Sequence, residues 1–232
     1  MSIFSYHLVR ISLIQRIRLS FLPITKYQGL IHAERMNVMT LGSPIFSWKR
    51  IMIRQVAFFA QWHSEHDLDK FMQNTQLGKL LDKGWYVKLS FVRQWGSISK
   101  FKIPENNVNS NIEEGSVIAV TIARMKFLQI PRFIKWGRPA EMLVRDHQGT
   151  ILSLASMSLP NVVSTFSIWK TQKEMTDMVQ GHSKIPHPKR HSDAMKERNR
   201  KDFHFEFTTL RFKPISEHGT WKNKQSYTLI KH

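Results

Sequence analysis

The residues best suited to chemistry are histidines, and they gather in the last third of the chain. Residues 178–195 read MVQGHSKIPHPKRHSDAM and contain His182, His187 and His191. Further histidines follow, among them His204 and His218. A metal ion needs several ligands that converge in a fixed geometry, whereas a haem iron needs one well-placed axial imidazole. The cluster therefore raises two hypotheses, a metal site and a haem ligand, beside a third in which the stretch is only a solvated basic loop.

The spacing of the histidines disfavours a tight metal site. His187 and His191 have the i, i+4 spacing of a helix face, but Pro186 and Pro188 argue against a helix there. The chain has no Cys, which excludes thiolate ligands, disulfides and cysteine nucleophiles. Asp193 is the one carboxylate close to these histidines in the sequence.

A haem ligand fits the pattern better, and two residues are alternatives for it. His191 begins the helix-like run HSDAMKERNRKDF, and His182 ends the preceding helix-like segment. A histidine at the start of a helix can be oriented by neighbouring backbone groups, which fixes a ligating imidazole. We therefore name His191 and His182 as alternative ligands of a haem iron.

Arginines and tryptophans in apolar strand-like runs are the other binding candidates. Arg124 and Arg211 lie in or at the end of such runs, where a cation is expected to pair or to face a cavity. Arginine can hold a carboxylate through two parallel hydrogen bonds, so both residues are candidates for contact with haem propionates. Trp62 and Trp169 end two strand-like runs, where an indole could stack on a flat cofactor or belong to the core.

Charge and motif content exclude several classes of function. The formal net charge is +18 and the pI is about 10.4, which attracts polyanions and anionic surfaces. The sequence has no helix-turn-helix, zinc-finger or RNA-binding signature, so we do not expect specific nucleic-acid binding. It also lacks G-x-S-x-G, P-loop and G-x-G-x-x-G motifs, which removes support for hydrolase, kinase and nicotinamide-dependent dehydrogenase functions.

The N-terminal segment mixes apolar residues with Arg10, Arg16 and Arg18. No apolar run there approaches the ~18 residues of a membrane span, and no signal-peptide core with a cleavage site follows. The lack of Cys fits a reducing compartment. We expect a cytoplasmic protein whose N-terminal segment has some affinity for a membrane surface.

An internal repeat supplies the elements that must position these residues. Residues 56–71 (VAFFAQWHSEHDLDKF) match residues 163–178 (VSTFSIWKTQKEMTDM): each is an apolar strand-like run ending in Trp, then a polar turn and a helix-like pattern. Each copy continues to a second strand that ends in Arg93 or Arg211. The second copy is 11 residues longer by this count, and we assign the excess to a His-rich basic insertion at 181–191.

The order of elements in the second half predicts a fold class. Residues 116–127 and 150–159 are strand-like, and residues 130–147 are helix-like, with Pro139 expected to break or restart the helix. Together with the repeat, the order is strand, helix, strand, strand, helix, strand, which is the ferredoxin-like unit. The first half has the same order less clearly.

We therefore predict an α+β fold of two tandem ferredoxin-like units. The first unit spans residues 1–105 and the second 117–232, with a linker at 106–116 that is rich in Asn and Ser. Two such units place their sheets face to face. The expected architecture is a dimeric α+β-barrel type formed within one chain.

The sequence resembles the spheroidene monooxygenase family along nearly its whole length. The resemblance is carried by residues 119–182 (AVTIARMKF to DMVQGH), by HSDAMKERNRKDFHFEFTTLRFKPISEHGTW, and in the first half by GLIHAERMNVMTLGSP followed by VAFFAQWHSEHDLDKFM. One departure follows Leu41-Gly42, where the family pattern has further glycines and this chain has SPIFSWKR.

This resemblance implies a haem-dependent oxygenase of the dimeric α+β-barrel fold that adds oxygen to a long apolar carotenoid. It would need an apolar small-molecule substrate and an electron donor, and could form an oligomer. In haem proteins of this fold the ligand generally comes from the second helix of a unit and points into the barrel, which suits His191 or His182. The alternatives are a protein that binds haem or an apolar ligand without turnover, and a basic structural or nucleic-acid-associated protein. No residue is assigned a catalytic role.

Overall fold

The computed structural model describes residues 2–22, 24, 27–43, 51–103 and 115–230. The elements of the first half are β1 (Ile3–Arg10), α1 (Leu13–Phe21), β2 (Leu30–Met39), β3 (Ile51–Trp62), α2 (Glu65–Asn74), α3 (Gln76–Leu81) and β4 (Trp85–Ser97). Those of the second half are β5 (Val117–Met125), η1 (Phe127–Gln129), α4 (Ile130–Asp146), β6 (Thr150–Ser158), β7 (Val162–Trp169), α5 (Gln172–Gln180), α6 (Arg190–Arg200) and β8 (His204–Gly219).

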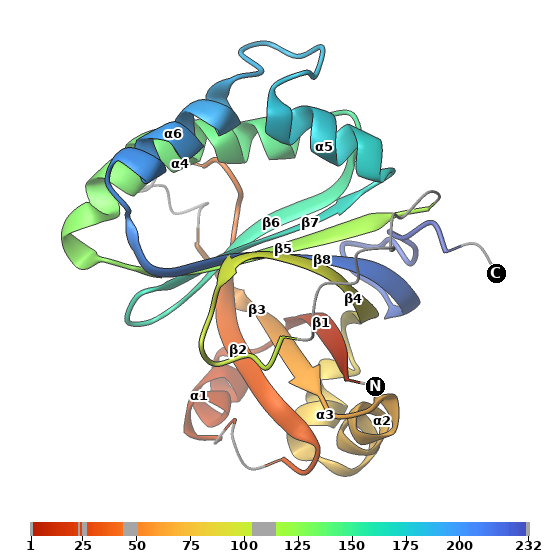
Figure 1. The fold of residues 1–232 in the computed structure, drawn as a ribbon. Helices are drawn as coiled ribbons and strands as arrows, with labels where there is room; N and C mark the ends of the chain where they lie inside the picture. The colour runs from red at the N-terminus through yellow and green to blue at the C-terminus, as the bar shows by residue number, and fades with distance from the viewer. Residues whose placement is uncertain (1, 23, 25–26, 44–50, 104–114, 231–232) are drawn as a thin grey trace.

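The eight strands close into one antiparallel barrel in the order β1-β3-β2-β6-β7-β5-β8-β4. Strands β1 to β4 form one side of the barrel and β5 to β8 form the other. Helices α1, α2 and α3 cover the first side from outside, and α4, α5 and α6 cover the second (Figure 1). Each side has the strand order of a ferredoxin-like unit, so the predicted fold class is confirmed.

The interior of the barrel is a packed apolar core to which both halves contribute. Phe4 and Phe59 from the first half meet Phe212 from the second, with ring centroids 5.0 and 5.9 Å from that of Phe212. The rings of Tyr6 and Phe166 stack across the barrel at 3.9 Å. Because side chains alternate between the two faces of a strand, the opposite residues of each strand face the helices.

Outside the barrel, the two helix layers differ in how they are filled. The first sheet and its helices enclose one large cluster that includes Phe58, Trp62, Phe71 and Tyr86. The second sheet and its helices enclose three smaller clusters instead. The difference leaves room for a cavity on the second side.

The predicted repeat is present in the structure. Strands β3 and β7 both end at the matched residues Trp62 and Trp169. The helix that follows each is capped by a hydroxyl side chain: Ser64 accepts from the N–H of Asp67, and Thr171 from that of Glu174. The repeat therefore reflects two copies of one structural unit.

Strand pairing relates the two halves residue by residue. Ile3 of β1 lies opposite Trp62, and Val117 of β5 lies opposite Trp169. Since the two tryptophans are equivalent, Ile3 and Val117 are equivalent as well. The same comparison extends along β1 and β5 and on to β4 and β8.

This comparison corrects the match between Arg93 and Arg211. Two residues beyond Ile3, Ser5 pairs with Lys88; two residues beyond Val117, Ala119 pairs with Arg211. Lys88 is therefore the equivalent of Arg211, and Arg93 lies opposite Arg211 in the β4–β8 pair. The sequence match misled because β8 does not end at Arg211 but continues to Gly219.

The extra length of the second half is consequently larger than predicted and is not confined to 181–191. From Trp62 to Lys88 the chain advances 26 residues, and from Trp169 to Arg211 it advances 42. Part of the excess lies in the loop 181–189, which replaces the single residue between α2 and α3. The rest lies in α6, which has 11 residues where α3 has 6, and in an earlier start of β8.

The expected break of the helix at Pro139 is not found. Helix α4 runs through Pro139 without ending there. Proline costs a helix one backbone hydrogen bond, but Phe133 on one side and Leu143 on the other pack into clusters against the sheet and so hold both halves of the helix. Most of the predicted linker 106–116 lies outside the described residues. None of the described helices is long and apolar enough to cross a membrane.

Candidate functional site

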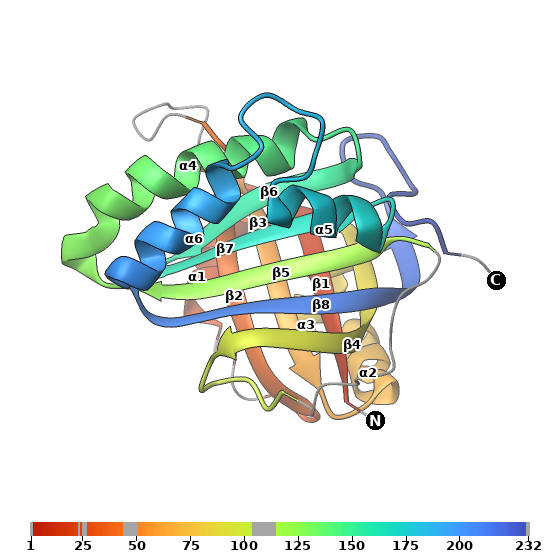
Figure 2. The same ribbon diagram turned by 45° about the horizontal axis from the view of Figure 1, so that its top comes forward.

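A cavity of about 700 Å³ lies between the second sheet and helices α4, α5 and α6. Figure 2 shows these three helices on one face of the sheet that β5 to β8 form, over β6 and β7. The size is within the range of ~300–1,000 Å³ that is typical of ligand pockets. Most of the surface is apolar, including four methionines: Met39, Met175, Met178 and Met195. The predicted ligand site was the barrel interior, but that space is filled by core side chains, and the cavity lies on the other face of the sheet.

The floor of the cavity is open because small residues replace rings. In the first half, a row of rings crosses β3, β1 and β4: the centroids of Phe58 and Tyr86 lie 5.8 and 5.1 Å from that of His7. The equivalent row in the second half consists of Thr165, Thr121 and Thr209. All three threonines line the cavity. The space that rings fill in one half is therefore free in the other.

His191 of α6 lies in the wall of this cavity. Helix α5 ends at Gly181, which takes the left-handed conformation at φ 79° and lets the chain turn away toward α6. The carbonyl of Val179 belongs to the last turn of α5, where carbonyls lack partners within the helix. It accepts a hydrogen bond from Nδ1 of His191 at 3.2 Å.

This bond defines the chemical state of the imidazole. A carbonyl can only accept, so the proton of the neutral ring is on Nδ1 and the lone pair is on Nε2. Burial lowers the pKa of His191 below its ordinary value, and the bond to Val179 offsets part of that effect. Among the described residues, none forms a hydrogen bond with Nε2. The geometry leaves a neutral, oriented nitrogen lone pair beside the cavity.

Arg211 lies in the cavity wall on β8. Its guanidinium stacks 4.6 Å from the ring centroid of Trp95, and Arg93 lies 5.1 Å from the same ring. Burial, with a further contribution from the charge of Arg93, lowers the pKa of Arg211 to about 10, so the group remains charged at neutral pH. The wall thus carries a fixed positive charge.

The structure brings three of the six predicted site residues to the cavity. Trp169 lines it together with His191 and Arg211, and its Nε1–H donates to Ser167. Trp62 is buried in the opposite helix layer, where its Nε1–H donates to Ser5. The two tryptophans therefore have equivalent places in the fold, but only Trp169 is beside open space.

The remaining two candidates, Arg124 and His182, do not line the cavity. Nε of Arg124 lies 2.7 Å from the carboxylate of Glu206, and its Nη2 lies 3.5 Å from that of Glu34. Two carboxylates therefore offset its charge, and the ion pairs link β5 to β2 and β8. The side chain of His182 is exposed, on the loop after α5.

Sequence reasoning passed over His204, which is the most enclosed histidine of the site. Its Nδ1 lies 3.0 Å from Asp202, and burial lowers its pKa to about 4. Its Nε2 is buried without a hydrogen-bond partner, among the rings of Phe133, Phe203 and Phe207. Because this nitrogen is sealed off by those rings, His191 offers the more accessible ligand. The Asp-x-His spacing of Asp202 and His204 was the signal available in the sequence.

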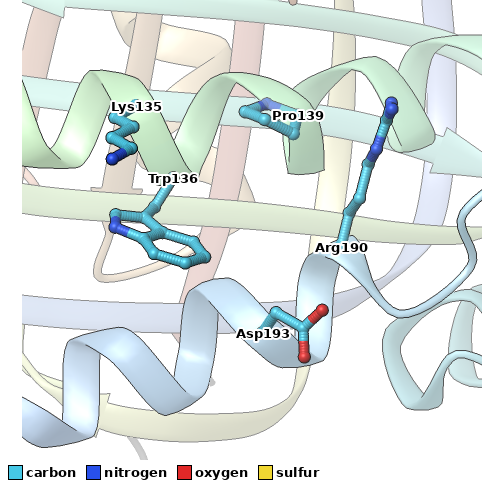
Figure 3. A pocket seen from close by; sticks show the side chains of 5 residues that line it. All are labelled: Lys135, Trp136, Pro139, Arg190 and Asp193. Atoms are coloured by element: carbon cyan, nitrogen blue, oxygen red, sulfur yellow. The ribbon is translucent and has the colours of Figure 1, made fainter.

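A second, smaller cavity of about 200 Å³ lies between α4 and α6. In Figure 3, Trp136 projects from α4 toward α6, and Arg190 reaches from the start of α6 toward α4. This space lies where α4 and α6, two of the helices that enclose the main cavity, pack against each other. Among the described residues, no three or more histidine, aspartate or glutamate side chains are grouped so that they could hold a metal ion.

The arrangement suits a large, mainly apolar ligand that carries an anionic group and has an atom able to accept a nitrogen lone pair. The apolar side chains of the wall, methionines among them, would contact its body. Arg211 would meet the negative charge, and His191 would meet the electrophilic atom.

Comparison with known proteins shows the fold alone. No known protein family and no curated protein matches the sequence. Among solved structures, an aldoxime dehydratase in complex with butyraldoxime is similar with a TM-score of 0.59 at 7% identity, over 92% of this chain and 79% of that one. Another aldoxime dehydratase has a TM-score of 0.53 at 9% identity, over 92% and 81%. A monooxygenase-like protein from Listeria innocua has a TM-score of 0.29 at 13% identity, over 93% and 96%.

Proposed function

We propose that the chain binds haem in the cavity under α4, α5 and α6, where His191 would ligate the iron, and acts as an oxygenase-type protein on an apolar substrate. The observation that carries the proposal is the state of His191. Its Nδ1–H is bound to the carbonyl of Val179, and its Nε2 lone pair is free beside the cavity. That orientation by a backbone carbonyl is typical of histidines that ligate metals.

The other residues of the cavity fit the remaining parts of haem. The floor of Thr121, Thr165 and Thr209 carries no ring of its own and so leaves room for a planar one, and Trp169 adds an aromatic side chain to the wall. Arg211 is placed to hold a propionate carboxylate. Haem would supply the activation of oxygen, which the side chains of the site cannot provide. The chain would bind and orient the cofactor, exclude water with its apolar wall, and leave space for the substrate.

The substrate class follows from the resemblance to spheroidene monooxygenases, which suggests a carotenoid. The apolar lining, with methionines from β2 and α5, favours such a molecule over a polar one. The alternative on the same site is binding of haem or an apolar ligand without turnover. Incubation with a carotenoid, a reductant and oxygen separates the two, because only the first yields an oxygenated product.

The proposal is tested by adding haem to the purified protein and recording the visible spectrum. The wild-type protein is expected to give a Soret band that survives gel filtration. His191→Ala removes the nitrogen proposed to bind the iron, and is expected to weaken haem binding by more than the ~10–100-fold that loss of a supporting residue costs. His182→Ala is the matched control, because that histidine lies in the same segment but is exposed.

The possible results separate the candidate ligands. Unchanged haem spectra in His191→Ala would reject His191 as the ligand. Loss of the band in His204→Ala but not in His191→Ala would show that His204, which is enclosed by phenylalanine rings, is the iron ligand instead. Absence of a Soret band in the wild-type protein would overturn the haem proposal.

A further inference from the structure

The equivalence of Lys88 and Arg211 shows what is missing around Arg211. In the first half, Nζ of Lys88 lies 2.8 Å from Glu65 and 2.7 Å from Asp69, both on α2. Burial alone would lower the pKa of Lys88, but the two carboxylates outweigh it and the pKa is raised. The cation of the first half is thus neutralised within the protein.

In the second half, the helix that would supply the carboxylates does not have them. The first helical residue after the strand-ending Trp and the N-cap is Glu65 in α2 and Gln172 in α5. Four residues on, Asp69 corresponds to Thr176. Arg211 is therefore left without the acidic partners that its equivalent has.

The environment of Arg211 is correspondingly unbalanced. Its Nε is buried with no hydrogen-bond acceptor. No carboxylate of the described residues forms an ion pair with it, and the charge that contributes to lowering its pKa is that of another cation, Arg93. A partly buried charge without a counter-ion is costly, and an anionic ligand would relieve that cost.

We propose that Arg211 is the anchor for a carboxylate on the molecule that occupies the cavity, with Arg93 strengthening the attraction of the anion to that end of the site. The occupant is then an amphipathic acid, with an apolar body over the threonine floor and an acid group at Trp95 and Arg211. With haem as the occupant the acid group is a propionate, and in that form the inference rests on the proposed function.

The test compares an acid with its ester. Haem and haem dimethyl ester share the iron and the ring, but the ester has no carboxylate. Wild-type protein is expected to bind haem at least about tenfold more tightly than the ester, since the ester cannot form a charge-assisted hydrogen bond with the guanidinium. Arg211→Gln should abolish this preference. Lys184→Gln, which removes a cation from the loop after α5, should preserve it.

A second variant guards against misfolding of Arg211→Gln. Gln172→Glu combined with Thr176→Asp would give Arg211 the two partners that Lys88 already has. The arginine is kept, the fold gains an ion pair, and the preference for the acid is expected to disappear. Retention of the preference in both variants would overturn the assignment.

The same variants distinguish failure of the anchor from failure of the haem proposal. If the wild-type protein binds neither porphyrin, cis-parinaric acid and its methyl ester replace them as apolar fluorescent probes. Preference for the free acid that depends on Arg211 would support the anchor without haem. Equal binding of acid and ester by the wild-type protein in that assay would reject it.

A separate observation concerns helix α1, on the opposite side of the barrel from the cavity (Figure 1). Its side chains Leu13, Ile14, Ile17 and Phe21 are 59%, 66%, 61% and 82% exposed. The spacings i, i+4 and i+8 of Leu13, Ile17 and Phe21 place them on one face. The helix is nevertheless well formed, with a capping box between Ser12 and Gln15.

The residues around this apolar stripe are basic. Arg16 and Arg18 lie on either side of it, and α1 contains no acidic residue. We infer that α1 lies on the surface of an anionic lipid bilayer, with its apolar side chains among the acyl chains and its arginines near the headgroups. A second copy of the chain fits less well, since both copies carry a net charge of +18 and four side chains are few against the ~20–30 residues of a stable interface.

Flotation with vesicles tests this surface. The protein is expected to float with phosphatidylcholine vesicles that contain phosphatidylglycerol, and less with phosphatidylcholine alone. The double substitution Ile17→Glu and Phe21→Glu should abolish flotation, whereas Leu229→Glu, at a comparably exposed leucine, should not. Equal flotation of both variants, or a dimer in solution that the double substitution dissociates, would overturn the inference.

Discussion

The difference between His191 and His182 is decided by how the chain folds around them. His191 is oriented by Val179 of the preceding helix, whereas His182, nine residues earlier, is exposed. The sequence identified His191 as a candidate from its place at a helix start. It could not separate it from His182, because the choice depends on how the loop 181–189 returns α6 to the sheet.

The arginines show the same limit more clearly. Arg124 and Arg211 both occupy apolar strands, so residue type and local pattern treat them alike. Arg124 meets Glu34 and Glu206 from two other strands, and only the closed barrel brings these together. Arg211 is distinguished by carboxylates that its helix lacks, and this becomes visible only when the halves are compared in register.

Burial of His7 makes a prediction about acid stability. The side chain is fully buried, its Nδ1 has no partner, and burial lowers its pKa to about 3. In the unfolded chain the pKa is ~6.5, so below that pH the unfolded state takes up a proton that the folded state does not. The free energy of unfolding should therefore fall as pH decreases, by about 2 kcal/mol from this residue at pH 5.

Urea unfolding at pH 7 and pH 5 measures the effect. His7→Phe keeps a ring between Phe58 and Tyr86 but cannot be protonated, so the loss of stability on acidification should shrink by about that amount. His182→Phe, at an exposed position, should leave it unchanged. An unaltered pH dependence in His7→Phe would contradict the burial argument.

At the scale of elements, the sequence predicted the order of strands and helices. It did not predict how the extra length of the second half is divided among them. The strand, helix and strand pattern of both halves was visible from apolar periodicity and from the two tryptophans. The excess of the second half was assigned to 181–191, but α6 and β8 share it. The two prolines in 181–191 reveal a loop insertion in the sequence, whereas a longer helix has no such signal. The whole excess was therefore assigned to the loop.

Removing a ring from the first half and adding one to the second half should have opposite effects on packing, because one layer is filled by rings and the other contains the cavity. Phe58 is fully buried and stacks on Phe71 with centroids 6.2 Å apart, so Phe58→Thr should cost ~3–5 kcal/mol of unfolding free energy. Thr165→Phe places a ring in the existing cavity, so stability should change by less than about 1 kcal/mol and haem binding should be lost. Urea unfolding and haem titration measure the two outcomes. Undiminished haem binding by Thr165→Phe would place the ligand elsewhere.

At the scale of the whole molecule, the sequence predicted the architecture well because the repeat is a long-range signal. Two ferredoxin-like units in tandem have few ways to bury both apolar sheet faces, and a shared barrel core is one of them. The position of the cavity was predicted less well. Apolar alternation shows that a strand has an inner and an outer face, but not which face is fully packed.

The closure of the barrel within one chain has a consequence for how such a site can arise. In a barrel made of two identical subunits, every substitution appears twice, and a change that opens one pocket opens its symmetric partner as well. A single chain is released from that constraint. One half can keep its aromatic rows and internal ion pairs, which stabilise the fold. The other half can have smaller side chains and looser packing, which leaves a cavity for a ligand.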